Sequence, residues 1–415
     1  MKRPPDHFAL SAYWFAIELH WAVLLGAALQ AQIARFIAPG AIGTAAAIIG
    51  GVGAALSIVS QLAAGRASDM TRRRLPFMAV GTLADVVALF AFALAPSFAA
   101  VIAAFAGVEI AFNISAGPYQ ALIPDRVPKN QQGKASGVMG LYRFLGTACG
   151  LLLARLFVRQ PGPRVTPHAF TLGLIELAGA ISVVLIVALA ITLARVREAD
   201  TGAAAPQPLL ATWPQRPSFA WLLVARAFAS GALYLILPFL AFYLRFALHV
   251  RSYIGTSLDL LMLMVACALI GTISAGAVGD RASKKKIILW SFAFLAGGAL
   301  VLAALTGVVW TWFVGAVLGL AWGAYYSVDW ALACNLLPEG RAGMLMAVWN
   351  IGASGPQVGS VVLGGLLVDR VGAAAGEPGA GYRALFVLIA ALLILAAASI
   401  AFVREPREGM ALRTN

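Results

Sequence analysis

Four ionisable residues stand well inside long apolar segments of this sequence: Glu18, Glu109, Arg226 and Asp329. A charge in hydrocarbon costs about 2.5 kcal/mol or more, so such a side chain is expected to face a water-filled cavity or a partner of opposite charge. A carboxyl group in that setting can bind a proton and release it when its access to water changes. These residues therefore indicate ion-coupled chemistry inside a membrane.

Glu109 is the strongest candidate for binding the proton. Asn113 and Gln120 follow it by four and eleven residues, which places all three on one face of a helix. Arg143, in the next apolar segment, is the cation that we expect to compete with the proton for this carboxylate, and Glu18 is a second acidic candidate. The alternative is that Glu109 is a structural carboxylate, permanently paired with such a cation.

Aromatic side chains precede Asp329 on one helical face, with Tyr325 four and Trp322 seven residues before it. A carboxylate accepts hydrogen bonds from hydroxyl groups, and aromatic faces pack against the C–H face of a sugar ring. The same side chains suit a cationic drug, or form an aromatic belt at the membrane surface. Arg226 is expected to bind an anionic or hydroxyl-rich ligand, or to pair with Asp329 or Glu18.

The composition favours a membrane protein over a soluble enzyme. The 415 residues are 61% hydrophobic and 11% charged, whereas soluble domains are about 45–50% apolar and about one quarter charged. A spanning helix needs roughly 20 apolar residues, so the chain has room for about twelve of them. The net charge of +13 does not indicate nucleic acid, because the basic residues form short runs between apolar segments.

Apolar runs, and the Pro and Gly breaks between them, predict twelve helices. They are expected at 8–36, 41–64, 76–94, 98–122, 135–158, 169–194, 218–245, 255–278, 286–304, 308–334, 343–368 and 381–403. Most Lys and Arg residues lie in the loops after even-numbered helices and in the tails, which places these parts and both termini in the cytoplasm. We therefore expect a multi-pass protein of the cell membrane (plasma or inner membrane).

The longest internal polar stretch, 195–217, divides the chain almost in half. We expect an N-terminal six-helix bundle at 1–194, a cytoplasmic linker at 195–217 and a C-terminal six-helix bundle at 218–415. The two halves carry a related motif at the same place, after the second and the eighth predicted helix. Two related halves predict a pseudo-symmetric protein with a central site at their interface.

The repeated motif is Gly-x-x-x-Asp with basic residues after the aspartate, and it resembles the signature loop of the major facilitator superfamily. Its residues are Gly65, Asp69, Arg72 and Arg73 in the first half, and Gly276 and Asp280 in the second. Glycine permits close helix approach, an aspartate suits a helix N-terminus, and the arginines favour the anionic cytoplasmic leaflet or serve only as topology signals. The resemblance implies the twelve-helix facilitator fold, in which this loop is a conformational latch.

Two segments look more narrowly like the sucrose and related glycoside–cation symporters. Residues 71–81, TRRRLPFMAVG, resemble that group's GRRRPF segment with one leucine inserted. Residues 109–125, EIAFNISAGPYQALIPD, resemble its fourth helix, where Glu109 stands for an aspartate and Gln120 for a basic residue. In the superfamily, helices one, four, seven and ten line the cavity, and each carries one of the four ionisable residues named above.

Other ionisable residues lie in apolar segments as well. His20 is on a different helical face from Glu18, and we interpret it as structural, although an imidazole can change its charge in the physiological pH range. Asp85, Glu176 and Asp259 receive no role from the sequence.

The sequence has no G-x-x-x-x-G-K-[ST] loop, no metal-ligand spacing and no hydrolase motif. We therefore expect neither an enzyme nor an ATP-driven pump, and no cofactor or metal. Our hypothesis is symport of a sugar or glycoside with a proton, or another cation, by a monomer that works by alternating access among membrane lipids. Proton-coupled efflux of amphipathic drugs or metabolites is the alternative within transport. A non-transporting membrane scaffold or receptor is the alternative of another class.

Overall fold

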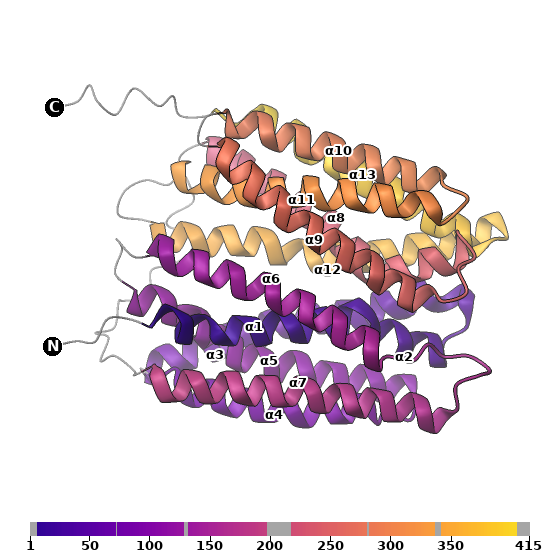
Figure 1. The fold of residues 1–415 in the computed structure, drawn as a ribbon, viewed down its shortest axis with the longest axis horizontal. Helices are drawn as coiled ribbons and strands as arrows, with labels where there is room; N and C mark the ends of the chain where they lie inside the picture. Colours follow the sequence, from indigo (N-terminus) through magenta and orange to yellow (C-terminus); the bar gives the residue numbers. More distant parts are fainter. Residues whose placement is uncertain are drawn as a thin grey trace. The chain divides into compact units, whose positions relative to one another are not determined.

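The computed structural model describes residues 6–71, 73–127, 132–196, 217–279, 282–336 and 342–404, and over these residues it is all-α (Figure 1). The first span is α1 (His7–Val23), which continues through a π-helical turn at Leu24–Ala28 into α2 (Leu29–Phe36). The following helices of the first half are α3 (Ile42–Thr71), α4 (Leu75–Ala93), α5 (Phe98–Arg126), α6 (Gln132–Phe157) and α7 (Pro167–Arg195). Those of the second half are α8 (Pro217–Phe246), α9 (Tyr253–Gly279), α10 (Lys284–Ala304), α11 (Val309–Leu336), α12 (Ala342–Ala375) and α13 (Pro378–Ala401).

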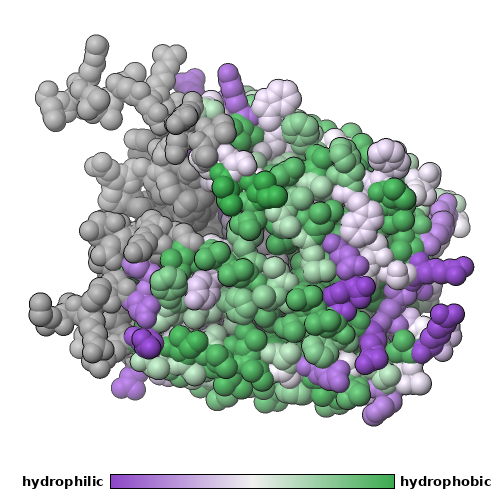
Figure 2. All heavy atoms as spheres, viewed as in Figure 1, coloured by the Kyte–Doolittle hydropathy of each residue, from purple (hydrophilic) through white to green (hydrophobic). Residues whose placement is uncertain are grey.

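Eleven of these spans are long and apolar enough to cross a membrane, counted over the described residues. The span formed by α11 is not among the eleven, and its tryptophans and tyrosines, such as Trp310 and Tyr326, lower its mean hydropathy. Figure 2 shows a face that is apolar across its middle, with many hydrophilic side chains at the right-hand end and others at the left. Large apolar side chains such as Val87 and Ile273 are exposed. Since a hydrocarbon solvent accounts for such a surface, the chain is a multi-pass membrane protein.

The chain forms two compact units. The first comprises Met1–Ala205 together with Arg251–Met262, and the second comprises Pro206–Val250 together with Leu263–Asn415. In the first unit α1 packs against α6 and α7, and α4 packs against α5 and α7. In the second, α8 packs against α12 and α13, and α10 packs against α11 and α13. When the membrane spans are counted along the chain, each pair of packed helices in the second unit lies six spans after a pair in the first. The two halves are therefore related in their helix packing as well as in their loop motif.

The beginning of α9 belongs to the first unit through polar contacts with the end of α6. Arg155 Nε donates to Asp259 Oδ1 at 2.9 Å. The Gln160 side chain donates to the backbone carbonyl of Arg251 at 2.6 Å and accepts from the backbone N–H of Ile254 at 3.3 Å. Asp259, which received no role from the sequence, is thus one half of an exposed ion pair.

Candidate functional site

An ion pair joins α1 to α6 in the first unit. Arg143 Nε donates to Glu18 Oε1 at 2.5 Å, and the two side chains are 34% and 22% exposed. The guanidinium also lies 4.9 Å from the centre of the Trp14 ring, a favourable cation–π distance. We expected Arg143 to accompany Glu109, and the structure corrects this: the carboxylate that it binds is Glu18. The pair is thus partly exposed, unlike the fully buried groups of this unit.

Close packing of α1 and α6 brings these charges together. A methyl group built on Gly150 of α6 would lie 2.5 Å from the backbone oxygen of Leu19, so only glycine permits this approach. On the other side of α1, the Tyr119 hydroxyl donates to the Leu10 carbonyl at 2.6 Å and accepts from the Trp14 N–H at 3.1 Å. This hydroxyl fixes α5 against the turn of α1 that carries Trp14.

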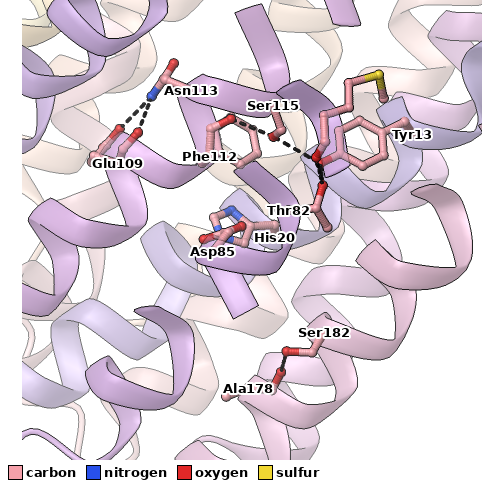
Figure 3. A network of polar contacts seen from close by, with 11 residues as sticks. Tyr13, His20, Thr82, Asp85, Glu109, Phe112, Asn113, Ser115, Ala178 and Ser182 are labelled. Carbon is pink, nitrogen blue, oxygen red and sulfur yellow. Dashed lines mark hydrogen bonds and ion pairs between the residues drawn. The ribbon is translucent and has the colours of Figure 1, made fainter. Parts of the chain in front are cut away.

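Glu109 lies elsewhere in the same unit and is buried, with 4% of its surface exposed. Asn113 Nδ2 donates to the Glu109 carboxylate at 3.3 Å and to the Glu109 backbone oxygen at 2.8 Å (Figure 3). A methyl group on Gly53 of α3 would lie 3.2 Å from Glu109 Oε1, so the carboxylate packs closely against α3. No cation among the described residues pairs with Glu109. The predicted association with Asn113 is present, whereas Gln120 is exposed.

Near Glu109 the structure gathers polar side chains that the sequence interpretation left without a function. His20 of α1 and Asp85 of α4 face each other, with 3.4 Å between Nε2 and Oδ2, and both are buried (Figure 3). The Tyr13 hydroxyl shares a hydrogen bond of 2.6 Å with Thr82, one turn before Asp85, and donates to Ser115 at 3.0 Å. The only sequence signal for the His20–Asp85 pair was the presence of ionisable residues in apolar segments, because the two residues are far apart in the sequence.

A second ion pair joins α8 to α11 in the second unit. Arg226 Nη1 donates to Asp329 Oδ2, and the side chains are 11% and 1% exposed. Of the partners considered for Arg226, the structure thus selects Asp329. Tyr325 is buried, and its ring lies 5.4 Å from the Trp322 ring and 4.8 Å from the Phe292 ring of α10. The predicted aromatic and acidic group is therefore present, but its carboxylate already has a cation.

The motif loops are described only in part. The Asp69 side chain, Arg72 and Asp280 lie outside the described residues, and Arg73 is exposed. A methyl group on Gly65 would meet no described atom within 4 Å, and one on Gly276 would lie an ordinary 3.5 Å from Ser327 Oγ. The close helix contact predicted at Gly65 is thus not found among the described residues.

Near Gly65, the loop between α3 and α4 is held by hydrogen bonds, not by a close helix contact. Ser68 Oγ donates to the Gly65 carbonyl at 2.9 Å and accepts from Arg74 Nη1 at 3.0 Å. Arg74 thereby ties the start of α4 to the last turns of α3. Over the described residues, no three His, Cys, Asp or Glu side chains cluster in a way that holds a metal ion.

Comparison with known proteins gives one family and several similar folds. The family model described as Major Facilitator Superfamily matches residues 7–359. A bacterial homolog of the human lysosomal transporter Spinster, in an inward-facing and occupied conformation, has a TM-score of 0.72 at 16% identity, with 96% of each chain covered. The nucleoside transporter NupG has a TM-score of 0.71 at 11% identity, covering 96% of this chain and 100% of that one. No curated protein matches the sequence. At these identities the similarity concerns the fold alone.

Proposed function

Because the chain belongs to the Major Facilitator Superfamily, we propose that it is a secondary transporter that imports a sugar or glycoside together with a proton. The prediction of an all-α facilitator fold is confirmed by the family match and by the similar folds. Proteins of this fold move small molecules by exposing a central site alternately to the two sides of the membrane. The proton and the sugar are the specific parts of the proposal, and they rest on the polar and aromatic side chains inside the helices.

Proton coupling is supported above all by the contrast between Glu109 and the other intramembrane carboxylates. Glu18 and Asp329 each bind a guanidinium, so their charged forms are compensated. Glu109 is 4% exposed and has an amide as its hydrogen-bond partner. A buried carboxylate without a cation is costly when charged, so it holds a proton until water reaches it. Arg143 and Glu18 then act as an auxiliary ion pair that we expect to respond to the substrate.

Substrate binding is assigned to side chains in both units. In the first, Asn113 and Gln120 of α5 offer amide donors and acceptors to hydroxyl groups. In the second, the proposed contacts are Arg226, Trp322, Tyr325 and Asp329. An ion pair presents charged donors and acceptors, and an aromatic face suits the C–H face of a sugar ring. This combination supports a neutral ligand rich in hydroxyl groups.

Efflux of a cationic drug is the weaker candidate. A lipophilic cation would need a carboxylate and an aromatic surface, and Asp329 with Tyr325 and Trp322 supplies both kinds of group. Arg226 neutralises that carboxylate, however, and a second cation would have to displace a buried guanidinium. The observed ion pair therefore favours the neutral ligand.

The motif loops are proposed to act as latches between conformations. This role comes from the family resemblance of Gly65, Asp69, Arg72, Arg73, Gly276 and Asp280. We also propose that the stretch 195–217 links two six-helix bundles at the cytoplasmic side, where both termini lie. Cysteine substitution at the tails and in this stretch, followed by labelling with an impermeant thiol reagent from either side, tests the orientation.

The substrate proposal is tested by uptake into proteoliposomes with an imposed pH gradient. The probes are radiolabelled sucrose, maltose and a β-glucoside, with uridine and a lipophilic cation as comparisons. We expect one of the sugars to accumulate and a protonophore to abolish its accumulation. Expulsion of the lipophilic cation, or accumulation of uridine alone, would replace the sugar proposal, and the absence of any transport would favour a scaffold or receptor.

A further inference from the structure

His20 and Asp85 form a fully buried pair in the first unit that the function proposed above does not use. Their side chains are 0% and 1% exposed, and 3.4 Å separates Nε2 from Oδ2. A charge-assisted hydrogen bond would be shorter, at about 2.7–2.9 Å. Both ring nitrogens of His20, and Oδ1 of Asp85, are buried without a hydrogen-bond partner among the described residues.

This pair is not explained by a structural role. Buried polar groups in folded proteins are almost always hydrogen-bonded, because an unmet bond is costly. A hydrophobic pair would fill the same space between α1 and α4 without that cost. Ionisable groups kept inside a membrane under such conditions mark a path for ions or protons. The unpaired atoms of His20 and Asp85 would serve a function if the pair bound and released a proton.

The pair is placed beside Glu109 by the packing of α5. The His20 ring stacks on Phe112 of α5, with 5.0 Å between ring centres and 11° between planes, and Phe112 lies three residues after Glu109. On α4, a methyl group at Gly81 would lie 2.5 Å from the Ser115 backbone nitrogen, so the two helices touch one turn from Asp85. Glu109 and Asp85 thus each lie about one helical turn from a contact that α5 makes with α1 or α4.

The other charged and titratable groups on the surrounding helices do not balance these carboxyls. Tyr13 lies on the same side of α1, where its hydroxyl bonds to Thr82 and Ser115. On α5, the Tyr119 hydroxyl is bonded to the α1 backbone. Among the other charged groups described on the packed helices, Arg143 is paired with Glu18 and Arg155 with Asp259, His168 and Glu176 of α7 are exposed, and His7 is buried at the first residue of α1.

We propose that His20, Asp85 and Glu109 form one proton-binding cluster, in which the His20–Asp85 pair holds a proton that the transport cycle takes up and releases. This inference rests on the proposed proton-coupled function and adds a site to it. With one proton shared between the imidazole and Asp85 and one on Glu109, the cluster is neutral. Loss of one proton to water leaves a single negative charge, whereas loss of both would place two carboxylates in a dry site. The cluster therefore exchanges one proton at a time.

Infrared difference spectra of the purified full-length protein, between about pH 5 and about pH 8, test this cluster directly. A protonated carboxyl group in a dry site gives a carbonyl stretching band that shifts in heavy water. We expect Glu109→Gln to remove one pH-dependent band, and Asp85→Asn both to remove another and to shift the band of Glu109. Glu176→Gln is the matched control, because this exposed carboxyl on α7 should leave both bands unchanged.

Histidine-selective nitrogen-15 resonance spectra provide a second readout, in which the titration itself is followed in the native protein. The chain has four histidines, and His20→Gln identifies the signal of His20. We expect that signal to change with pH in the native protein and to change differently in Glu109→Gln. A His20 signal that is constant across the pH range, or a Glu109 band untouched by Asp85→Asn, would overturn the cluster. Neither readout requires transport, so a protein that titrates as expected but carries no solute would refute only the proposed function.

Discussion

The two units neutralise their intramembrane charges in different ways. In the second, Arg226 and Asp329 join α8 to α11 and are almost completely buried. In the first, α1 and α5 are the equivalent helices, but no ion pair among the described residues joins them. They meet instead through the His20–Phe112 stack and the Tyr119 hydroxyl. The second unit thus joins these two helices through a compensated charge, whereas in the first unit Glu18 of α1 is compensated by Arg143 of α6. Glu109 of α5 has no cation among the described residues, and it is the carboxyl that we propose for the mobile proton.

The largest effect is expected for Arg226→Met, which would leave Asp329 buried without its cation. Removing one member of a buried pair costs about 3–5 kcal/mol. We expect a loss of this size in the free energy of unfolding, measured by denaturant titration in mixed micelles. The double variant Arg226→Met with Asp329→Leu should recover most of it, because no charge is then left behind. Equal losses in the single and double variants would show that packing, and not charge, is responsible.

A second variant, Gly81→Val, tests whether the α4–α5 contact holds the uncompensated groups together. The added carbon would lie 2.5 Å from the Ser115 nitrogen, and overpacking of this kind costs about 1–3 kcal/mol. We expect a lower melting temperature and loss of the electrostatic effect of Asp85 on the Glu109 infrared band. Gly107→Val on α5 is the control, since a methyl group there would meet only the Ala88 side chain at 3.6 Å.

A smaller effect is expected where the ion pair is partly exposed. Glu18 is 22% exposed, so water stabilises its charge when Arg143→Gln removes the cation. We expect a loss of about 1 kcal/mol in the free energy of unfolding, less than at Arg226, because the exposed member is screened. Measuring Arg143→Gln and Arg226→Met in one titration series tests whether burial of the carboxylate determines how much free energy of unfolding is lost. A larger loss at Arg143 would mean that Glu18 is effectively dry.

The smallest effect is expected at the Arg155–Asp259 pair, whose side chains are 48% and 37% exposed. Exposed pairs contribute less than about 1 kcal/mol. Arg155→Gln should therefore change the melting temperature only slightly, with the difference disappearing at high salt. A strong salt-independent destabilisation would show that this contact between α6 and α9 is packed and dry.

The fold could be predicted from the sequence because each span is a long apolar run with marked ends. The predicted helix at 169–194 corresponds to α7 (Pro167–Arg195), and the one at 381–403 to α13 (Pro378–Ala401). The π-helical turn at Leu24–Ala28 was not predicted, because its residues are as apolar as their neighbours and leave the pattern unchanged.

The candidate site was less predictable, because an apolar helix does not reveal which way each polar side chain turns. Arg143 could face several helices, and its choice of Glu18 over Glu109 depends on the close contact at Gly150. The pairing of His20 with Asp85 could not be predicted either, because the sequence does not show which way each side chain turns. The Arg226–Asp329 pair was one of the alternatives considered, since opposite charges on two apolar helices have few other ways to be neutralised.

The most direct test of the account compares two assays of Glu109→Gln in proteoliposomes, using the sugar that most raises the melting temperature of the protein. Counterflow exchange needs only alternating access, whereas accumulation against a gradient also needs the proton. We predict that the variant exchanges sugar at a rate close to that of the native protein, yet no longer concentrates it when a pH gradient is imposed. Normal accumulation by the variant would contradict the assignment of Glu109 as a carrier of the coupled proton.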